Sequence, residues 1–119
     1  MVHDMAILSV DLLQRQLRLD DEIAAAEAML LQAYLSAAEA HISARLGRNL
    51  YAAASDIPET DGYGIVLTDH PDVVLAVMLL GGHYYNNREA VTDGQLAEIP
   101  LGVAQLIGPL TILYPEITP

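Results

Sequence analysis

The feature that most limits the possible folds is a long stretch from Asp20 to Leu46 whose residues follow a helical pattern almost throughout. Asp20 is a good N-cap residue, and Asp21 and Glu22 follow in the first turn, where negative charge complements the helix dipole. Gly47 is suited to end a helix because glycine readily adopts the left-handed conformation found there. The sequence therefore predicts one long helix over this stretch.

One narrow polar stripe follows the predicted long helix, and it consists of Gln32, Ser36, Glu39 and Ser43. The remaining positions are nearly all alanine, leucine or isoleucine. So narrow a stripe predicts that most of the helix circumference is covered, and the many alanines permit another helix to approach closely. The sequence does not divide this coverage between the chain's own core and neighbouring subunits.

Two further helices are indicated on either side of the long one. Ser9 is a suitable N-cap for a short first helix that ends near Leu19. Pro71 occupies the favoured first position of a third helix, which either Asp69 or His70 would cap.

The third predicted helix begins with an unbroken hydrophobic run, Val73–Leu80, which predicts that its first half is buried on all sides. Gly81 and Gly82 follow directly. Each costs roughly 1 kcal/mol relative to alanine within a helix. Their presence therefore predicts close backbone contact with another helix.

The remaining segments are a long connection, a short helix and a terminal arm. Asn49–His70 contains proline, glycine and acidic residues and reads as a connection, within which Tyr63 and Ile65–Leu67 form a short extended segment. A short fourth helix is predicted over Leu101–Ile107. The tail, Leu110–Pro119, alternates apolar residues with prolines and reads as an extended arm.

Together these elements predict a single all-α domain over residues 1–119, with a bundle of about four helices within 9–109 and an arm over 110–119. A chain of this length can bury one core. Hydrophobic residues make up 53% of the chain and charged residues only 18%. This surplus predicts apolar surface reserved for neighbouring subunits.

The chain carries a net charge of −11, from sixteen acidic residues against five arginines and no lysine. Such a surface cannot collect phosphates by releasing their counterions, which argues against tight nucleic-acid binding. The net charge is nevertheless compatible with an acidic wall beside DNA, because repulsion would keep the DNA from sticking to it.

The sequence also predicts a protein made in the cytoplasm that does not enter a membrane. Its first ten residues do not resemble a signal peptide, since Asp4 interrupts a broken apolar run. The longest apolar stretch, Val73–Gly82, is about half the length needed to cross a bilayer. The absence of cysteine excludes disulfides and thiolate metal sites.

The densest polar and aromatic cluster lies at the end of the third predicted helix. Helical spacing pairs its members at i and i+4, which permits an acid–base site built on His83 and Glu89. The favoured interpretation is structural: a helix end held to its neighbours, with Arg88 reaching Glu39 or Glu27. The cluster consists of His83, Tyr84, Tyr85, Asn87, Arg88 and Glu89.

No metal, cofactor or catalytic site is predicted. The histidines are scattered and lack metal-binding spacing, although Asp69, His70 and Asp72 stand close together in sequence. His41 is interpreted as a half-buried histidine with its hydrogen bonds satisfied. No glycine-rich phosphate loop, nucleophile elbow or pair of catalytic carboxylates stands out, so an enzyme is not expected.

The arginines near the ends of the first two predicted helices permit two interpretations. Arg15 and Arg18 stand in the first helix, and Arg45 and Arg48 stand at the end of the second. They could contact an acidic surface of a partner protein. The favoured interpretation is solvated charge that complements the negative ends of the helices.

Two apolar segments are candidates for contact with partner proteins. The alternative is that they fold back over the chain's own core, and the residues alone do not decide between these possibilities. In the connection the candidates are Tyr63, Ile65, Val66 and Leu67, and in the tail they are Ile112, Leu113, Tyr114 and Ile117.

The ordered set of elements resembles the phage head–tail connector family, including its gene transfer agent relatives. The resemblance covers roughly Ser9–Leu110, although Asn86 stands where an acidic residue is common in the family. It rests on a helix opening at Ser9, a long helix ending in Arg45-Leu46-Gly47-Arg48, a helix ending in His83-Tyr84-Tyr85-Asn86-Asn87-Arg88-Glu89-Ala90, and Ile99-Pro100-Leu101-Gly102-Val103 followed by Leu106-Ile107.

This resemblance implies a virion adaptor that forms a ring beneath the portal vertex and binds a head-closure or tail-side protein. Packaged DNA would pass through the ring without being read. Symmetry matched to the portal would give about twelve subunits, a dodecameric homo-oligomer. The alternative is a small helical interaction or regulatory module with no role in a virion.

Overall fold

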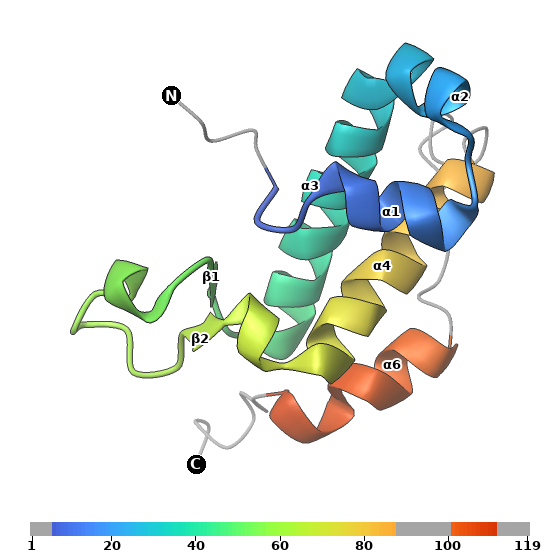
Figure 1. The fold of residues 1–119 in the computed structure, drawn as a ribbon. Helices are drawn as coiled ribbons and strands as arrows, with labels where there is room; N and C mark the ends of the chain where they lie inside the picture. Colours follow the sequence, from blue (N-terminus) through green and yellow to red (C-terminus); the bar gives the residue numbers. More distant parts are fainter. Residues whose placement is uncertain (1–5, 88–100, 112–119) are drawn as a thin grey trace.

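The computed structural model describes residues 6–87 and 101–111, and Figure 1 shows that helices dominate them. The predicted helical fold with a long connection is confirmed, and the connection also contains a small sheet. The helices are α1 (Val10–Leu17), α2 (Asp21–Ala26), α3 (Ala28–Leu46), α4 (Pro71–Asn86) and α6 (Leu101–Ile107), with short 3-10 turns η1 (Ala54–Asp56), η2 (Leu67–Asp69) and η3 (Gly108–Leu110), and strands β1 (Leu50–Tyr51) and β2 (Ile65–Val66).

The predicted helix starts follow from local capping. The Ser9 hydroxyl accepts a hydrogen bond from the Asp11 amide at the start of α1, and the Asp20 carboxylate accepts one from the Ile23 amide at the start of α2. Pro71 opens α4 as expected, whereas its N-cap, His70, makes no side-chain capping bond. The short-range signals in the sequence therefore placed these starts correctly.

The prediction of one continuous helix from Asp20 to Leu46 is wrong. The helix breaks at Glu27, whose φ and ψ of −111° and 20° separate α2 from α3. The Tyr85 hydroxyl on α4 donates a 2.5 Å hydrogen bond to the Glu27 carboxylate at this break. No glycine or proline marks the position, so the local pattern does not indicate the break, which coincides with this tertiary contact.

The core is formed mainly where α3 packs against α4, with α1 lying across both helices and α6 against α4 (Figure 1). The buried side of α3 repeats at spacings of three and four residues, as an amphipathic helix requires. It consists of Leu31, Leu35, Ala38, Ile42 and Leu46, each fully buried. From α6, Val103 and Ile107 complete the core.

The paired glycines of α4 face α1, but they meet leucine side chains rather than the backbone of that helix. A side chain added at Gly81 would lie 3.5 Å from Leu13 of α1, and one added at Gly82 would lie 3.3 Å from Leu17. The expectation that the first half of α4 is buried on all sides is wrong, because Leu75 keeps 44% of its surface exposed. Within the described residues, α1, α3 and α6 leave this side of α4 uncovered.

The connection between α3 and α4 leaves the bundle and returns to it through two parallel strands (Figure 1). Leu50 pairs with Ile65 and Tyr51 pairs with Val66. The short extended segment predicted here is therefore real over Ile65–Val66, but Leu67 already belongs to the turn η2. The strands hold both ends of the connection at the C-terminal end of α3.

The short fourth helix is confirmed as α6, with the predicted bounds. It passes into the 3-10 turn η3, in which Pro109 follows Gly108. Thr111 then has extended backbone angles. The predicted arm over residues 112–119 lies outside the described residues.

Candidate functional site

The aromatic cluster at the end of α4 packs against α3. Tyr84 is buried and Tyr85 half-buried, and both rings lie 6.4 Å from the ring of Tyr34 on α3. Burial raises the pKa of Tyr84, so its phenol stays protonated at neutral pH. These aromatics join the end of α4 to α3.

The predicted i to i+4 pair between His83 and Asn87 is present. The Asn87 amide donates a 2.8 Å hydrogen bond to the His83 carbonyl and lies 3.3 Å from the His83 ring nitrogen Nδ1. The other ring nitrogen, Nε2, is buried without a hydrogen-bond partner among the described residues. Arg88 and Glu89 lie outside the described residues, so the pairing of His83 with Glu89 stays a prediction.

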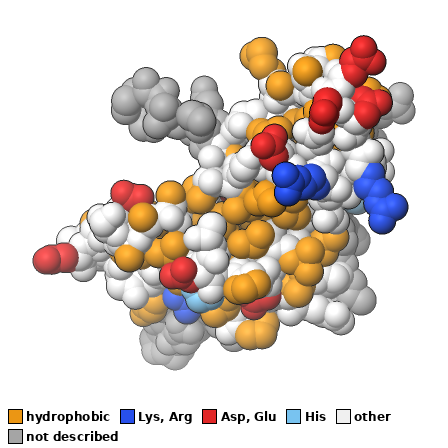
Figure 2. Space-filling model, viewed as in Figure 1, with side chains coloured by type: hydrophobic (Ala, Val, Ile, Leu, Met, Phe, Trp, Pro, Cys, Tyr) orange, Lys and Arg blue, Asp and Glu red, His pale blue; other side chains and the backbone are white. Residues whose placement is uncertain are grey.

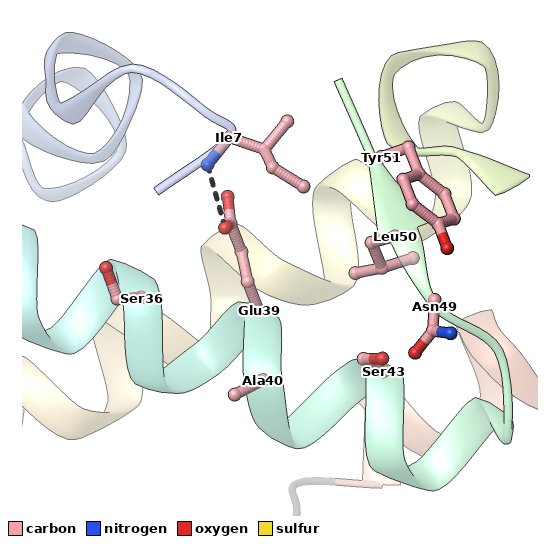
Figure 3. A pocket seen from close by; sticks show the side chains of 8 residues that line it. All are labelled: Ile7, Ser36, Glu39, Ala40, Ser43, Asn49, Leu50 and Tyr51. Carbon is pink, nitrogen blue, oxygen red and sulfur yellow. Dashed lines mark hydrogen bonds between the residues drawn. The ribbon is translucent and has the colours of Figure 1, made fainter. Parts of the chain in front are cut away.

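The polar stripe predicted on the long helix is interrupted at Glu39, which is buried. Its two carboxylate oxygens accept 2.8 Å hydrogen bonds from the amides of Ile7 and Leu8, so the N-terminal segment lies over this part of α3 (Figure 3). Burial raises the pKa of Glu39, although both amide bonds oppose the shift. The carboxylate thus anchors the chain's own backbone, a role that the stripe did not indicate.

Beside Glu39 lies a hollow of about 430 Å³ between the N-terminal segment, α3 and β1 (Figure 3). Ser36 and Ser43 of α3 and Asn49 and Tyr51 of the connection contribute its other polar groups. The Tyr51 hydroxyl is already bound to Asp61. Because backbone amides engage the Glu39 carboxylate, this hollow lacks a free acid–base pair.

The histidines and acids do not form a metal site in the part of the chain that is described, since no three of them come together there. His41 is half-buried as expected, but the expectation that its hydrogen bonds are satisfied is wrong, because its Nε2 has no partner among the described residues. Burial and the nearby charge of Arg45 lower the pKa of His41 and favour the neutral ring.

Asp61 organises the outer part of the connection. Its carboxylate accepts hydrogen bonds from the Tyr51 hydroxyl at 2.7 Å, the Asn49 amide at 3.1 Å and the Tyr63 backbone amide at 3.1 Å. These bonds, led by the one from Tyr51, lower the pKa of Asp61. A side chain at Gly64 would lie only 2.6 Å from the Tyr51 ring, so this tight turn needs glycine.

The apolar residues proposed as partner contacts divide into two groups. Ile65 and Leu67 belong to the chain's own core, with exposures of 9% and 0%. Tyr63 is 60% exposed and Val66 is half-buried, so both remain accessible candidates. Successive side chains of a strand point to opposite faces, so the sequence could have indicated that Ile65 and Leu67 face inward while Val66 faces outward. The tail candidates Ile112, Leu113, Tyr114 and Ile117 lie outside the described residues.

Arg48 has a role that sequence reasoning missed. Its guanidinium donates from Nε to the Leu110 carbonyl at 2.8 Å and from Nη1 to the Tyr63 carbonyl at 2.9 Å. Its position beside a helix end indicated either contact with a partner or complementation of the helix dipole, and neither acceptor is near it in sequence. Arg48 therefore connects α3, the outer connection and the end of η3.

The side of α3 opposite the core forms an exposed face without formal charge. From Ala28 to Ala44 no Asp, Glu, Lys or Arg side chain is exposed, and Met29 is 88% exposed. The face continues into Leu30, which is 37% exposed and lies beside Met29 and Ala33. We define the α3 face by its exposed residues, Ala28, Met29, Ala33, Ala37 and Ala40.

None of the helices within residues 6–87 and 101–111 combines the length and the apolar character that a membrane span requires. A family model described as "Phage gp6-like head-tail connector protein" matches residues 7–110 of the chain. No curated protein and no solved structure gives a significant match.

Proposed function

Because the chain belongs to the phage gp6-like head–tail connector family, a structural family that connects phage heads and tails, we propose that it is an adaptor subunit forming a ring under the portal. The ring joins the capsid to the tail or to the next head-completion protein and lets DNA pass. Matching of the portal's symmetry would require about twelve copies. The protein acts at the head–tail interface of the virion, after assembly in the host cytoplasm.

The observation that carries the proposal of a ring is the α3 face. Exposed apolar groups such as Met29 favour association when they meet another surface. Two copies that each carry a net charge of −11 repel one another, and an uncharged face offers contact without burying acids. Alanines along this face allow a neighbouring backbone to come close. We therefore assign the α3 face to the contact between neighbouring subunits.

A closed ring requires that the α3 face meets a different surface of the next copy. Leu12 of α1 and Leu75 of α4 are 40% and 44% exposed and are candidates for that second surface. This arrangement would use the apolar surplus that the composition contains. It also accounts for the exposed side of α4.

The passage of DNA without binding is supported by the charge distribution. Figure 2 shows acidic side chains at the projecting end of the connection and around α2. Asp56 and Glu59 lie in the former and Asp21 and Glu22 in the latter. The acidic excess in these two regions repels phosphate, so a passing duplex gains little from counterion release there.

Contacts with the portal and with the head-closure or tail-side protein are assigned to Tyr63, Val66 and the C-terminal arm. Tyr63 supports this assignment because its ring stays 60% exposed. The proposal includes no catalytic role. Tyr84 and Tyr85 pack against Tyr34, and Asn87 bonds to the His83 backbone, so these members of the cluster serve the fold.

The test is the mass of the assembly in solution and on heads prepared without this chain. The wild-type protein should form a ring, alone or on such heads, when measured by mass photometry and negative-stain microscopy. Ala37→Glu, which adds charge to the α3 face, should reduce assembly strongly, whereas Ala52→Glu, the same change at an exposed position of the connection, should not.

A strict monomer in both settings would overturn the ring. A stable monomer or dimer that never associates with heads would favour the alternative, a small helical regulatory module. If both variants assemble like the wild type, the ring stands and the assignment of the α3 face fails.

A further inference from the structure

The backbone of Tyr63 is held on both sides by side chains, while its ring faces outward. The Tyr63 amide donates to the Asp61 carboxylate, and the Tyr63 carbonyl accepts from the Arg48 guanidinium at 2.9 Å. The side chain nevertheless keeps 60% of its surface exposed. An aromatic side chain on a backbone fixed in this way loses little conformational freedom when it enters a partner's pocket.

Arg48 is itself held in place at the end of α3. Gly47 adopts the left-handed conformation with φ of 71°, which ends the helix and directs the chain into β1. The Arg48 carbonyl accepts a 2.6 Å hydrogen bond from the Ser43 hydroxyl. The guanidinium therefore extends from a backbone that is hydrogen-bonded to the preceding helix.

The same guanidinium reaches the end of η3. Its Nε donates to the carbonyl of Leu110, which stands just before the terminal arm. A planar guanidinium can donate to two acceptors in a fixed geometry, and bonds from a charged donor are stronger than neutral ones. Within residues 6–87 and 101–111 no carboxylate forms an ion pair with Arg48, so its charge acts on backbone carbonyls.

We propose that Arg48 is a positioning residue that joins the loop carrying Tyr63 and the turn η3, which ends at Leu110, into one partner-binding surface. The inference rests on the proposed function and deepens it, because it identifies how two contact segments act together. Both segments lie near the C-terminal end of α3 (Figure 1). A hollow of about 400 Å³ between this end of α3 and the connection is lined in part by Arg48, Asn49 and Tyr63.

The surface fits a protein partner with an apolar cleft that takes the Tyr63 ring and a polar group that meets its hydroxyl. Tyrosine combines large apolar area with one polar end and is enriched among the residues that dominate binding energy. Arg48 would act through Tyr63 and η3 rather than by touching the partner. The two segments would then bind together or not at all.

We call the two hydrogen bonds from Arg48 to the Tyr63 and Leu110 carbonyls the bridge. It can be tested directly by measuring the distance between the two segments that it joins. The chain has no cysteine, so spin labels can be placed at Gly62→Cys and Gly108→Cys, where an added side chain meets nothing within 4 Å. In the otherwise wild-type chain the electron–electron distance distribution should be narrow. Arg48→Ala should broaden it, and Arg48→Lys should restore it only in part.

Arg45→Ala is the matched control, because it removes the same charge from an exposed residue in the last turn of α3. It should leave the distribution narrow. If Arg48→Ala gives a distribution as narrow as the wild type, the bridge does not position these segments and the inference is overturned. If Arg48→Ala does not fold, as judged by circular dichroism, Arg48→Lys supplies the same test.

The second measurement is binding to heads prepared without this chain. Arg48→Ala and Tyr63→Ala should both reduce binding at least tenfold, equivalent to about 1.4 kcal/mol, while Arg45→Ala should not. A broadened distance with unchanged binding would overturn the shared surface. Failure of the wild-type chain to bind would instead overturn the proposed function, and the spin-label result would still decide whether the bridge exists.

Discussion

The helical core and the outer connection, residues 52–64, are held together by different interactions. In the core, aliphatic side chains of α1, α3 and α4 such as Leu13, Leu35 and Val77 are fully buried against one another. In the outer connection no residue is buried, and Asp61 and Arg48 fix its backbone through hydrogen bonds. Apolar packing thus holds the scaffold, whereas a few polar groups hold the segment assigned to partner contact.

This difference separates stability from recognition. Burial of many aliphatic groups makes the bundle cooperative, because each loses its contacts only when the whole core opens. The outer connection can open locally, since its hydrogen bonds lie near solvent and concern few residues. A change in the core should therefore affect global unfolding, whereas one in the outer connection should affect local order and binding.

The largest effect is expected for Leu13→Ala, which removes a fully buried side chain that lies against Gly81 of α4. The free energy of unfolding, measured in urea, should fall by about 3 kcal/mol. Leu75→Ala, at a position 44% exposed, should change it by about 0.5 kcal/mol or less. Equal effects of the two changes would mean that burial does not govern the core.

Tyr85→Phe should lower the free energy of unfolding by about 1 kcal/mol, because it leaves the Glu27 carboxylate at the break between α2 and α3 without its hydroxyl donor. Tyr63→Phe is the matched change in the outer connection and should leave global unfolding unaltered. Urea titrations of both variants make the comparison. A larger effect at Tyr63 would reverse the contrast between the regions.

Gly81→Ala should raise the free energy of unfolding by somewhat less than about 1 kcal/mol, since alanine favours a helix more than glycine does. The added methyl group would lie 3.5 Å from Leu13, an ordinary contact distance. Gly82→Ala should gain less, because its methyl group would lie 3.3 Å from Leu17. Thermal denaturation of the two variants should rank them in this order, and destabilisation by Gly81→Ala would contradict the expectation.

The smallest effects, which depend on pH, should have opposite signs in the two regions. Burial raises the pKa of Glu39 above 4.5, so the stability it contributes is present below pH 4.5 and is lost as pH rises through the raised pKa. Hydrogen bonds from Tyr51 and Asn49 lower the pKa of Asp61 below 3.8, so its contribution is present above pH 3.8 and is lost as pH falls through the lowered pKa.

The two opposite pH dependences can be measured separately with Glu39→Gln and Asp61→Asn. Relative to Glu39→Gln, the wild type should lose global stability as pH rises above 4.5. Relative to Asp61→Asn, the wild type should lose hydrogen-exchange protection in the outer connection as pH falls below 3.8. If global stability and exchange protection changed with pH in the same direction, the two carboxyl groups would not have the opposite effects described.

The candidate partner surface was only partly predictable from the sequence. Tyr63 could be singled out because an apolar residue within a long polar connection suggests contact with something else. Ile65 and Leu67 were grouped with it, yet they enter the core, and only the pairing of β1 with β2 shows which way they face. Arg48 gave no local sign of its role, because its acceptors are separated from it by 15 and 62 residues.

By itself, the sequence determined where most helices begin and end, because caps such as Ser9, Pro71 and Gly47 act through interactions within a single helical turn. It also determined the acidic, apolar-rich character of the chain. The tertiary structure alone decided the break at Glu27 and the burial of Glu39. Each of these depends on which distant segment meets the residue, and the periodicity of one helix carries no information about that meeting.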